Sequence, residues 1–578
     1  MGIRGLTASL RPFAARSELA GRIVIDGPAL AYHILFACRL ESRVSTVLKD
    51  PSYSALGSKA IQWLDDLQSH GCQVSAIYFD GYLPTSKSVV RLDRVVETST
   101  ASNKYFLSTS SGIALDGDSE PALRQANPRM PIPAFIVPAI LDALRTSGRY
   151  SHLTHLVPGE ADCFCAEHVG REGGTLLTSD SDLLLYDLGQ DGRVVFFNDI
   201  EINNEEAAQL AALTYSQHAI CETLSLESGQ QGMLSLAFEI MMDPYRKVPS
   251  CVAQSKKNHS ANAFPLDYAN FISEYVKGPE STLAIPEYLK ILDPRVSEFV
   301  LSWTRDAEGG NSALDNAPRD GLIFYLPLLL DRWDRESAWS PSMWIRQLAY
   351  SLCGDTQGTK SMVSEYRRTM SRKSNGQAVE LLNDHDVAQI ARGLVSLFSS
   401  LIDTAAIPSS LGWATFCLQQ EITHASEHGK ESLALKLWQK ASKSRGRLDP
   451  GSWDTVHLAA QIQGTLYSLR ILHQVLRCQI GPLFTSAGLQ PQVAKLVDCL
   501  STLPSFADFP STTDVAGLFV RLQEAGVLDV LAEITGQQAH ISFEKTGSRS
   551  RRKKRQVDRL EQRKARPPPS ANPFDALS

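Results

Sequence analysis

Four short apolar segments in the first third of the chain each end at a carboxylate. They are Arg22–Asp26, Ala76–Asp80, His155–Asp162 and Thr175–Asp182. Short runs of β-branched and aromatic residues bounded by Gly, Pro or Ser are typical of strands, and fully apolar runs suit a sheet that is buried on both faces. The pattern therefore predicts an α/β fold with a parallel sheet flanked by helices.

Beyond residue 263 the hydrophobic pattern changes. Apolar residues recur at intervals of three and four, as at Leu322, Phe324, Leu326, Leu329, Leu330 and Trp333. This spacing is typical of amphipathic helices, and no strand series comparable to that of the first third appears. A polar stretch from Pro249 to Asn262 separates the two patterns. We therefore predict an α/β domain over residues 1–250, a linker over 251–262, a mostly helical region over 263–540 and a disordered basic tail over 541–578.

One segment inside the first domain lacks a regular pattern. Residues 99–130 are rich in Ser, Thr, Gly and Asp and show little periodicity. They predict a loop inserted before a helix over Ala134–Leu144.

Three tryptophans lie close together in the second half, at Trp333, Trp339 and Trp344. Such rings can stack on nucleic-acid bases. Core packing is the favoured interpretation, because large apolar rings are more often buried.

The carboxylates at the predicted strand ends suggest a metal site. In a parallel sheet, ligands bind outside the carboxyl ends of the strands, so these acids would converge on one edge. Each alone could be a turn residue or a helix N-cap. Two carboxylates about 4 Å apart repel by roughly 4 kcal/mol at an effective dielectric constant of 20, which favours a neutralising cation. An all-oxygen donor set selects hard cations, and two Mg²⁺ or Mn²⁺ ions suit phosphodiester cleavage. The acids are Asp26, Asp80, Glu160, Asp162, Asp180 and Asp182.

Composition narrows the class of protein. The chain has 578 residues, of which 43% are hydrophobic and 21% charged, as in a soluble globular protein. No apolar stretch reaches the length of a membrane span and no signal peptide is expected. Ten cysteines occur without any CxxC pair, which indicates a reducing intracellular compartment and argues against structural zinc.

The charge is unevenly distributed. Residues 545–566 hold eleven Lys and Arg and two acids, while the net charge of the whole chain is −6. The body is therefore acidic, and nucleic-acid binding would need local basic patches and metal ions. Within the tail, Arg549–Arg555 fits a nuclear import signal or a phosphate-binding arm, and the alternative is a merely solvated tail.

Five motifs together resemble the XPG/flap-endonuclease superfamily. They are Met1–Leu6, Ile25–Gly27, Phe79–Gly81, Pro158–Asp162 and Thr178–Leu184. The likeness covers about residues 1–250 and is closest to the Asteroid-like branch, because the helix-two-turn-helix module of flap endonucleases is missing. The resemblance implies a PIN-like fold and two divalent ions that cleave DNA at junctions, flaps or overhangs.

The resemblance also implies roles for individual residues. The first metal set would be Asp26, Asp80, Glu160 and Asp162, and the second Asp180 and Asp182, with Asp243 as a seventh acid after the Leu236-Ala-Phe run. Lys87 and Arg94, together with Arg91, would steer the scissile phosphate from one helical face. Gly2 would lie close to the active site. The loop before residue 134 stands where the family carries the arch that gates single strands.

The expected function is therefore a metal-dependent, structure-selective DNA nuclease in DNA repair, located in the nucleus. The expected partners are branched or single-stranded DNA ends, and other proteins through the helical C-terminal region, but no membrane. The alternative is a catalytically inactive PIN-like scaffold in nucleic-acid-associated complexes. Intact acids favour the enzyme, whereas the missing DNA-clamping module and the unusual context of Asp243 favour the scaffold.

Overall fold

The computed structural model describes most of the chain in ten segments. They are residues 2–84, 87–114, 130–203, 209–276, 285–307, 322–354, 362–401, 409–443, 447–479 and 490–527. The tail with Arg549–Arg555 lies outside the described residues. The described residues up to Ala525 form one compact unit.

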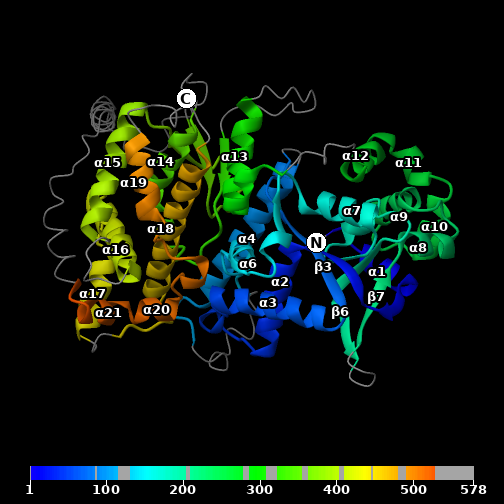
Figure 1. The fold of residues 1–578 in the computed structure, drawn as a ribbon, viewed down its shortest axis with the longest axis horizontal. Coiled ribbons are helices and arrows are strands. Elements are labelled where there is room, and N and C mark those ends of the chain that lie inside the picture. Colours follow the sequence, from blue (N-terminus) through cyan, green and yellow to red (C-terminus); the bar gives the residue numbers. More distant parts are fainter. Residues whose placement is uncertain are drawn as a thin grey trace, which may run out of the picture. The chain divides into compact units, whose positions relative to one another are not determined.

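A seven-stranded sheet organises the N-terminal half (Figure 1). Its strands in spatial order are β1 (Ala15–Glu18), β7 (Gln209–Tyr215), β6 (Arg193–Asn203), β5 (Thr175–Thr178), β2 (Gly21–Asp26), β3 (Cys72–Asp80) and β4 (Thr154–Val157). The run from β6 to β4 is parallel, and β7 and β1 pair antiparallel at one edge. The four strands recognised in the sequence are thus four of the five strands in the parallel part of the sheet, and β6 is the fifth.

Helices cover both faces of this sheet. Ile23, Val24 and Ile25 of β2 are all 0% exposed, which a strand achieves only when both faces are covered. Helices α2, α3 and α6 pack together and against β3 or β4, while α7 packs against β2, β3 and β5. The helices of the first half are α1 (Leu6–Leu10), α2 (Gly27–Glu41), α3 (Tyr53–Ser69), α4 (Ser88–Ser108), α6 (Ile136–Thr146), α7 (Ala161–Glu172), α8 (Gln217–Leu224), α9 (Gln230–Met242), α10 (Val248–Ser255), α11 (His259–Ala263) and α12 (Pro265–Tyr275).

The C-terminal region is mostly helical, as predicted. Helix α18 is its centre: nearly all of its length is buried, and α13, α14, α16, α17 and α19 pack around it. The elements are α13 (Pro294–Ala307), α14 (Met343–Cys353), α15 (Asp384–Leu401), α16 (Ser409–Glu427), α17 (Leu433–Lys443), α18 (Trp453–Cys478), α19 (Gln490–Leu500), α20 (Thr512–Ala516) and α21 (Leu518–Glu524), and a small sheet of β8 (Leu322–Tyr325), β9 (Met362–Tyr366) and β10 (Gln377–Glu380). Among the described residues, no helix is long and apolar enough to cross a membrane.

The small sheet corrects the helical interpretation of residues 322–333. Leu322 and Phe324 are buried while Ile323 is 40% exposed, which is the two-residue alternation of the strand β8. The chain after Tyr325 is irregular. Over so short a stretch the apolar positions fit both the helical and the strand period. Pairing with β9 stabilises the strand.

Two further boundaries differ from the sequence-based expectation. Helices α10 and α11 occupy most of the predicted linker 251–262, and they are polar because only one side of each is buried, through Cys251, Val252 and Ser260. The predicted loop over 99–130 begins later than expected, since α4 continues to Ser108, with Ser99 and Ser102 buried. Residues 115–129 lie outside the described part.

The tryptophans lie in the packed interior or at its border. Trp339 is 2% exposed and donates to the carbonyl of Pro327 at 3.1 Å. The indole N–H of Trp344 donates to Gln420 at 3.0 Å, and that of Trp333 to Ser102 at 3.4 Å. These contacts agree with core packing rather than base stacking.

Candidate functional site: a carboxylate edge

Four carboxylates lie at the carboxyl ends of four neighbouring parallel strands. Asp26 and Asp80 are the last residues of β2 and β3, Glu160 follows β4, and Asp180 follows β5. Because β5, β2, β3 and β4 are adjacent, these side chains share one edge of the sheet. We call this group, with Asp162 and Asp182, the carboxylate edge.

Close backbone packing brings the ends of β3 and β4 together. A Cβ atom on Gly81 would lie 2.2 Å from the carbonyl oxygen of Val157. The N–H of Gly81 donates to the carbonyl of Gly159 at 3.1 Å. Glycine after Asp80 therefore allows the approach that places Asp80 beside Glu160.

Asp26 is held from two sides. Its side chain caps α2 by accepting the N–H of Ala29 at 3.2 Å, and it accepts the hydroxyl of Thr178 at 2.6 Å. Burial raises the pKa of Asp26 to about 7, and the negative charges of Asp80 and Asp180 add to the rise despite these two hydrogen bonds. The ionised form is thus costly here without a cation.

The start of α7 contacts Asp80 and carries Glu160 at its N-cap and Asp162 in its first turn. Asp80 accepts the N–H of Ala161 at 2.7 Å, a bond that the start of a helix favours for an anion. Burial nevertheless raises the pKa of Asp80, and Glu160 raises it further. The pKa of Asp162 is raised well above its usual value by burial and then by Asp26 and Asp80.

The second acidic pair meets the amino terminus of the chain. Asp182 accepts the backbone N–H of Ile3 at 2.8 Å, and burial together with Asp180 raises the pKa of Asp182 to about 6. A Cβ on Gly2 would lie 2.5 Å from a carboxylate oxygen of Asp180, and the φ of Gly2 is +107°. Position 2 is therefore restricted to glycine by its contact with this pair.

The three predicted basic residues have different positions. Lys87 directly precedes α4 and its ammonium lies 2.6 Å from Glu160. Burial lowers the pKa of Lys87, but Glu160 and the neighbouring acids together raise the pKa above its usual value, so the group stays charged. Arg94 is exposed on α4. Arg91 turns to the C-terminal region instead, where it pairs with Glu298 at 2.8 Å and lies over the ring of Tyr325.

Asp243 does not join the other six acids in the described contacts. It follows the end of α9, is 42% exposed, accepts the N–H of Tyr245 at 3.2 Å and pairs with Arg246 at 3.5 Å. These local bonds account for its position without a metal ligand role.

Two residues of the site were missed by the sequence analysis. Thr178 orients Asp26, and Tyr275, at the end of α12, hydrogen-bonds Asp182. The Thr-Ser-Asp context of Thr178 was visible in the sequence, but its bond to Asp26 spans 152 positions. No local signal marks Tyr275, which lies beyond the expected end of the domain.

The chemistry of the donor set fits divalent metal ions. Six carboxylates share one edge of the sheet, and most of them raise the pKa of a neighbouring acid. In the described contacts, Lys87 is the cation that pairs with this group. A hard cation would remove this repulsion. Within the described part of the chain, however, no group of three or more His, Cys, Asp or Glu side chains is already arranged to hold an ion.

Comparison with known proteins shows a similarity to one family over part of the chain. Residues 132–381 match the model of a family described as XPG domain containing. The matched span includes Glu160, Asp162, Asp180 and Asp182, and it continues past the sheet to β10. No curated protein matches the chain. The match covers less than half of the chain and shows a likeness to proteins that contain an XPG domain, and the mostly parallel seven-stranded sheet flanked by helices is consistent with a PIN-like fold.

Proposed function

We propose that the chain is a metal-dependent, structure-selective DNA nuclease of the Asteroid-like branch, which acts on flaps, overhangs or junctions in DNA repair. The observation that carries the proposal is the carboxylate edge, where burial and mutual repulsion hold the pKa of Asp26, Asp162 and Asp182 above the usual value. A fold gains no stability from such repulsion, and cation binding is the simplest use for it.

The side chains would divide into two ligand sets for Mg²⁺ or Mn²⁺. Asp26, Asp80, Glu160 and Asp162 would hold one ion, and Asp180 and Asp182 the other. When bound, such ions neutralise charge on a phosphodiester and lower the pKa of an attacking water.

The remaining groups position the ligands and the DNA. Thr178 fixes one oxygen of Asp26, while Tyr275 and the N–H of Ile3 fix Asp182. The ammonium of Lys87, which pairs with Glu160, would donate to a phosphate oxygen of the bound strand. Arg94 is exposed on α4, the helix that Lys87 precedes, and would contact a phosphate further along the strand.

The function is tested by a cleavage assay with the purified full chain. Flap, overhang, junction and single-stranded DNA are each incubated with Mg²⁺, with Mn²⁺ or with EDTA. We expect cleavage of at least one branched or overhanging DNA with a divalent ion and none with EDTA. Absence of cleavage on every substrate would contradict the proposal.

One observation favours a second function, a catalytically inactive scaffold. Among the described residues no cluster is ready to hold a metal ion, and Asp243 is paired elsewhere. A scaffold would bind DNA in EDTA as tightly as in Mn²⁺ and would cleave none of the substrates.

Changing both Lys87 and Arg94 to Ala should weaken DNA binding. Each lost phosphate contact reduces the slope of log affinity against log salt by about 0.7 on single strands, so the pair should reduce it by about 1.4. Fluorescence anisotropy at several salt concentrations measures the slope. An Arg91→Ala variant serves as a contrast: because Arg91 pairs with Glu298, it should lower stability rather than the slope. An unchanged salt slope in the double variant would show that Lys87 and Arg94 do not contact phosphates.

We further propose that the tail directs the protein to the nucleus and that the helical region binds protein partners. Residues 545–566 carry eleven basic residues in a segment too polar to form a core. Deleting residues 545–578 should move a fluorescently tagged chain to the cytoplasm and leave cleavage at low salt nearly intact. A truncated chain that stays nuclear would remove the import role.

A further inference from the structure

The connection between β9 and β10 is strongly basic. We call residues 367–376 the basic hairpin loop; it contains Arg367, Arg368, Arg372 and Lys373 and no acidic residue. In a chain with a net negative charge, such a local concentration of positive charge indicates a binding site for an anionic partner.

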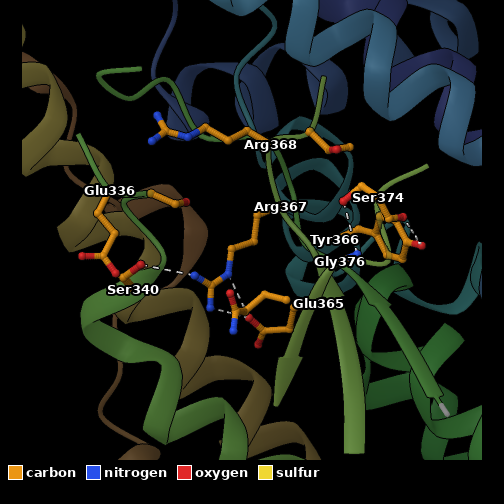
Figure 2. A pocket seen from close by; sticks show the side chains of 11 residues that line it. Glu336, Ser340, Glu365, Tyr366, Arg367, Arg368, Ser374 and Gly376 are labelled. Atoms are coloured by element: carbon orange, nitrogen blue, oxygen red, sulfur yellow. Dashed lines mark hydrogen bonds and ion pairs between the residues drawn. The ribbon is translucent and has the colours of Figure 1, made fainter. Parts of the chain in front are cut away.

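Its first two arginines anchor the base of the loop. Arg367 pairs with Glu365 at 2.8 Å and donates to Ser340 at 3.2 Å. Arg368 pairs with Asp331 at 2.9 Å and lies over the ring of Trp333. Figure 2 shows Arg367 directed toward Glu365 and Ser340, on the lining of a cavity of about 310 Å³. These two charges are already neutralised inside the protein.

The middle of the loop contacts α4. The N–H of Thr369 donates to Ser99 at 3.1 Å, and the guanidinium of Arg372 lies 2.7 Å from Asp93. Arg372 is nevertheless 70% exposed, and Lys373 is exposed as well. The tip thus presents two cations to solvent beside the helix that starts at the carboxylate edge.

The position of the tip relates it to that edge. Asp93 follows Lys87 by six residues, which corresponds to about 9 Å along a helix axis. Successive phosphates of one DNA strand are about 3.4 Å apart along a duplex axis, so this distance is equivalent to two or three nucleotides. A strand that runs along α4 from a phosphate at Lys87 would therefore reach the level of the tip a few nucleotides away.

We propose that the basic hairpin loop binds the DNA phosphate backbone through Arg372 and Lys373, two or three nucleotides from the carboxylate edge. The proposal rests on the proposed function for its choice of DNA. The simpler alternative is that the basic residues only attach the loop to α4. An exposed ion pair such as Arg372–Asp93, however, contributes only about 0–1 kcal/mol to stability. Arg367, Arg368 and Thr369 already fix the loop, so Lys373 adds charge that attachment does not need.

The test is binding of fluorescent single-stranded and flap DNA to the full chain in EDTA, where no cleavage interferes. The Arg372→Ala/Lys373→Ala variant should reduce affinity several-fold and the salt slope on single strands by about 1.4. Asp93→Asn should act in the opposite direction and tighten binding, because it frees Arg372 and removes a negative charge. The control is Arg16→Ala/Arg171→Ala, which removes two exposed, ion-paired arginines, on β1 and at the end of α7.

The outcomes separate this proposal from the nuclease function. A lower DNA affinity and a smaller salt slope in the loop variant, with little change in the control, would support DNA binding by the loop. This holds even if no cleavage is found on any substrate. Equal effects in loop variant and control, no effect in a folded loop variant, or no DNA binding by the unmodified chain would each overturn it.

Discussion

Asp180→Ala should abolish cleavage and leave the fold intact. Asp180 follows β5 and lies beside Asp182, Asp26 and Asp162, whose pKa values it raises. Removing one of several repelling carboxylates should cost little stability and should raise the melting temperature in the absence of metal. Loss of a metal ligand, in contrast, should reduce cleavage by several orders of magnitude.

The measurement compares initial cleavage rates and melting temperatures of Asp180→Ala and the unmodified chain. Asp243→Ala is the matched control, because Asp243 lies outside the carboxylate edge and should retain activity. Full activity in Asp180→Ala, on a substrate that the unmodified chain cuts, would contradict the two-ion site.

Glu365→Leu should destabilise the C-terminal region by about 3–5 kcal/mol, the usual cost of breaking a buried ion pair. Glu365 and Arg346 are both 0% exposed and form two hydrogen bonds of 2.6 and 2.9 Å, and Tyr350 donates to the same carboxylate. The substitution would leave the guanidinium of Arg346 buried without its counter-ion.

Burial opposes ionisation of Glu365, but Arg346 and Arg367 lower its pKa to about 2. Its contribution is therefore complete above the ordinary pKa near 4.5 and is lost as the pH falls toward 2. Urea unfolding followed by tryptophan fluorescence measures the loss, with Lys290→Ala, from an exposed pair with Glu287, as a control that should change little. A Glu365→Leu chain as stable as the unmodified one would show that packing compensates for the charge.

The sequence predicted those parts of the fold that local pattern determines. Apolar runs that end in Asp or Glu gave four strands of the sheet and placed Asp26, Asp80, Glu160 and Asp180 at its carboxyl edge. Such runs are distinctive because strands buried on both faces contain almost no polar residues.

The sequence-based predictions differ from the structure where tertiary contacts determine the position of a residue or element. The sequence spacing predicted that Arg91 shares one helical face with Lys87 and Arg94. In the structure α4 begins only at Ser88, and Arg91 pairs with Glu298, 207 positions away. Tyr275 reaches Asp182 only because the predicted linker is folded into α10 and α11, ahead of α12. The small sheet depends on pairing between β8 and β9, which no local period reports.

The central claim is that the carboxylate edge binds divalent ions, and the most direct test is a count of bound Mn²⁺ by electron paramagnetic resonance. Increasing Mn²⁺ is added to the full chain, to Asp180→Ala and to Asp26→Asn. We predict two ions for the unmodified chain and weakened binding or fewer ions in both variants, because each loses a ligand of one set. An unmodified chain that binds no Mn²⁺, or variants that bind as it does, would contradict the claim.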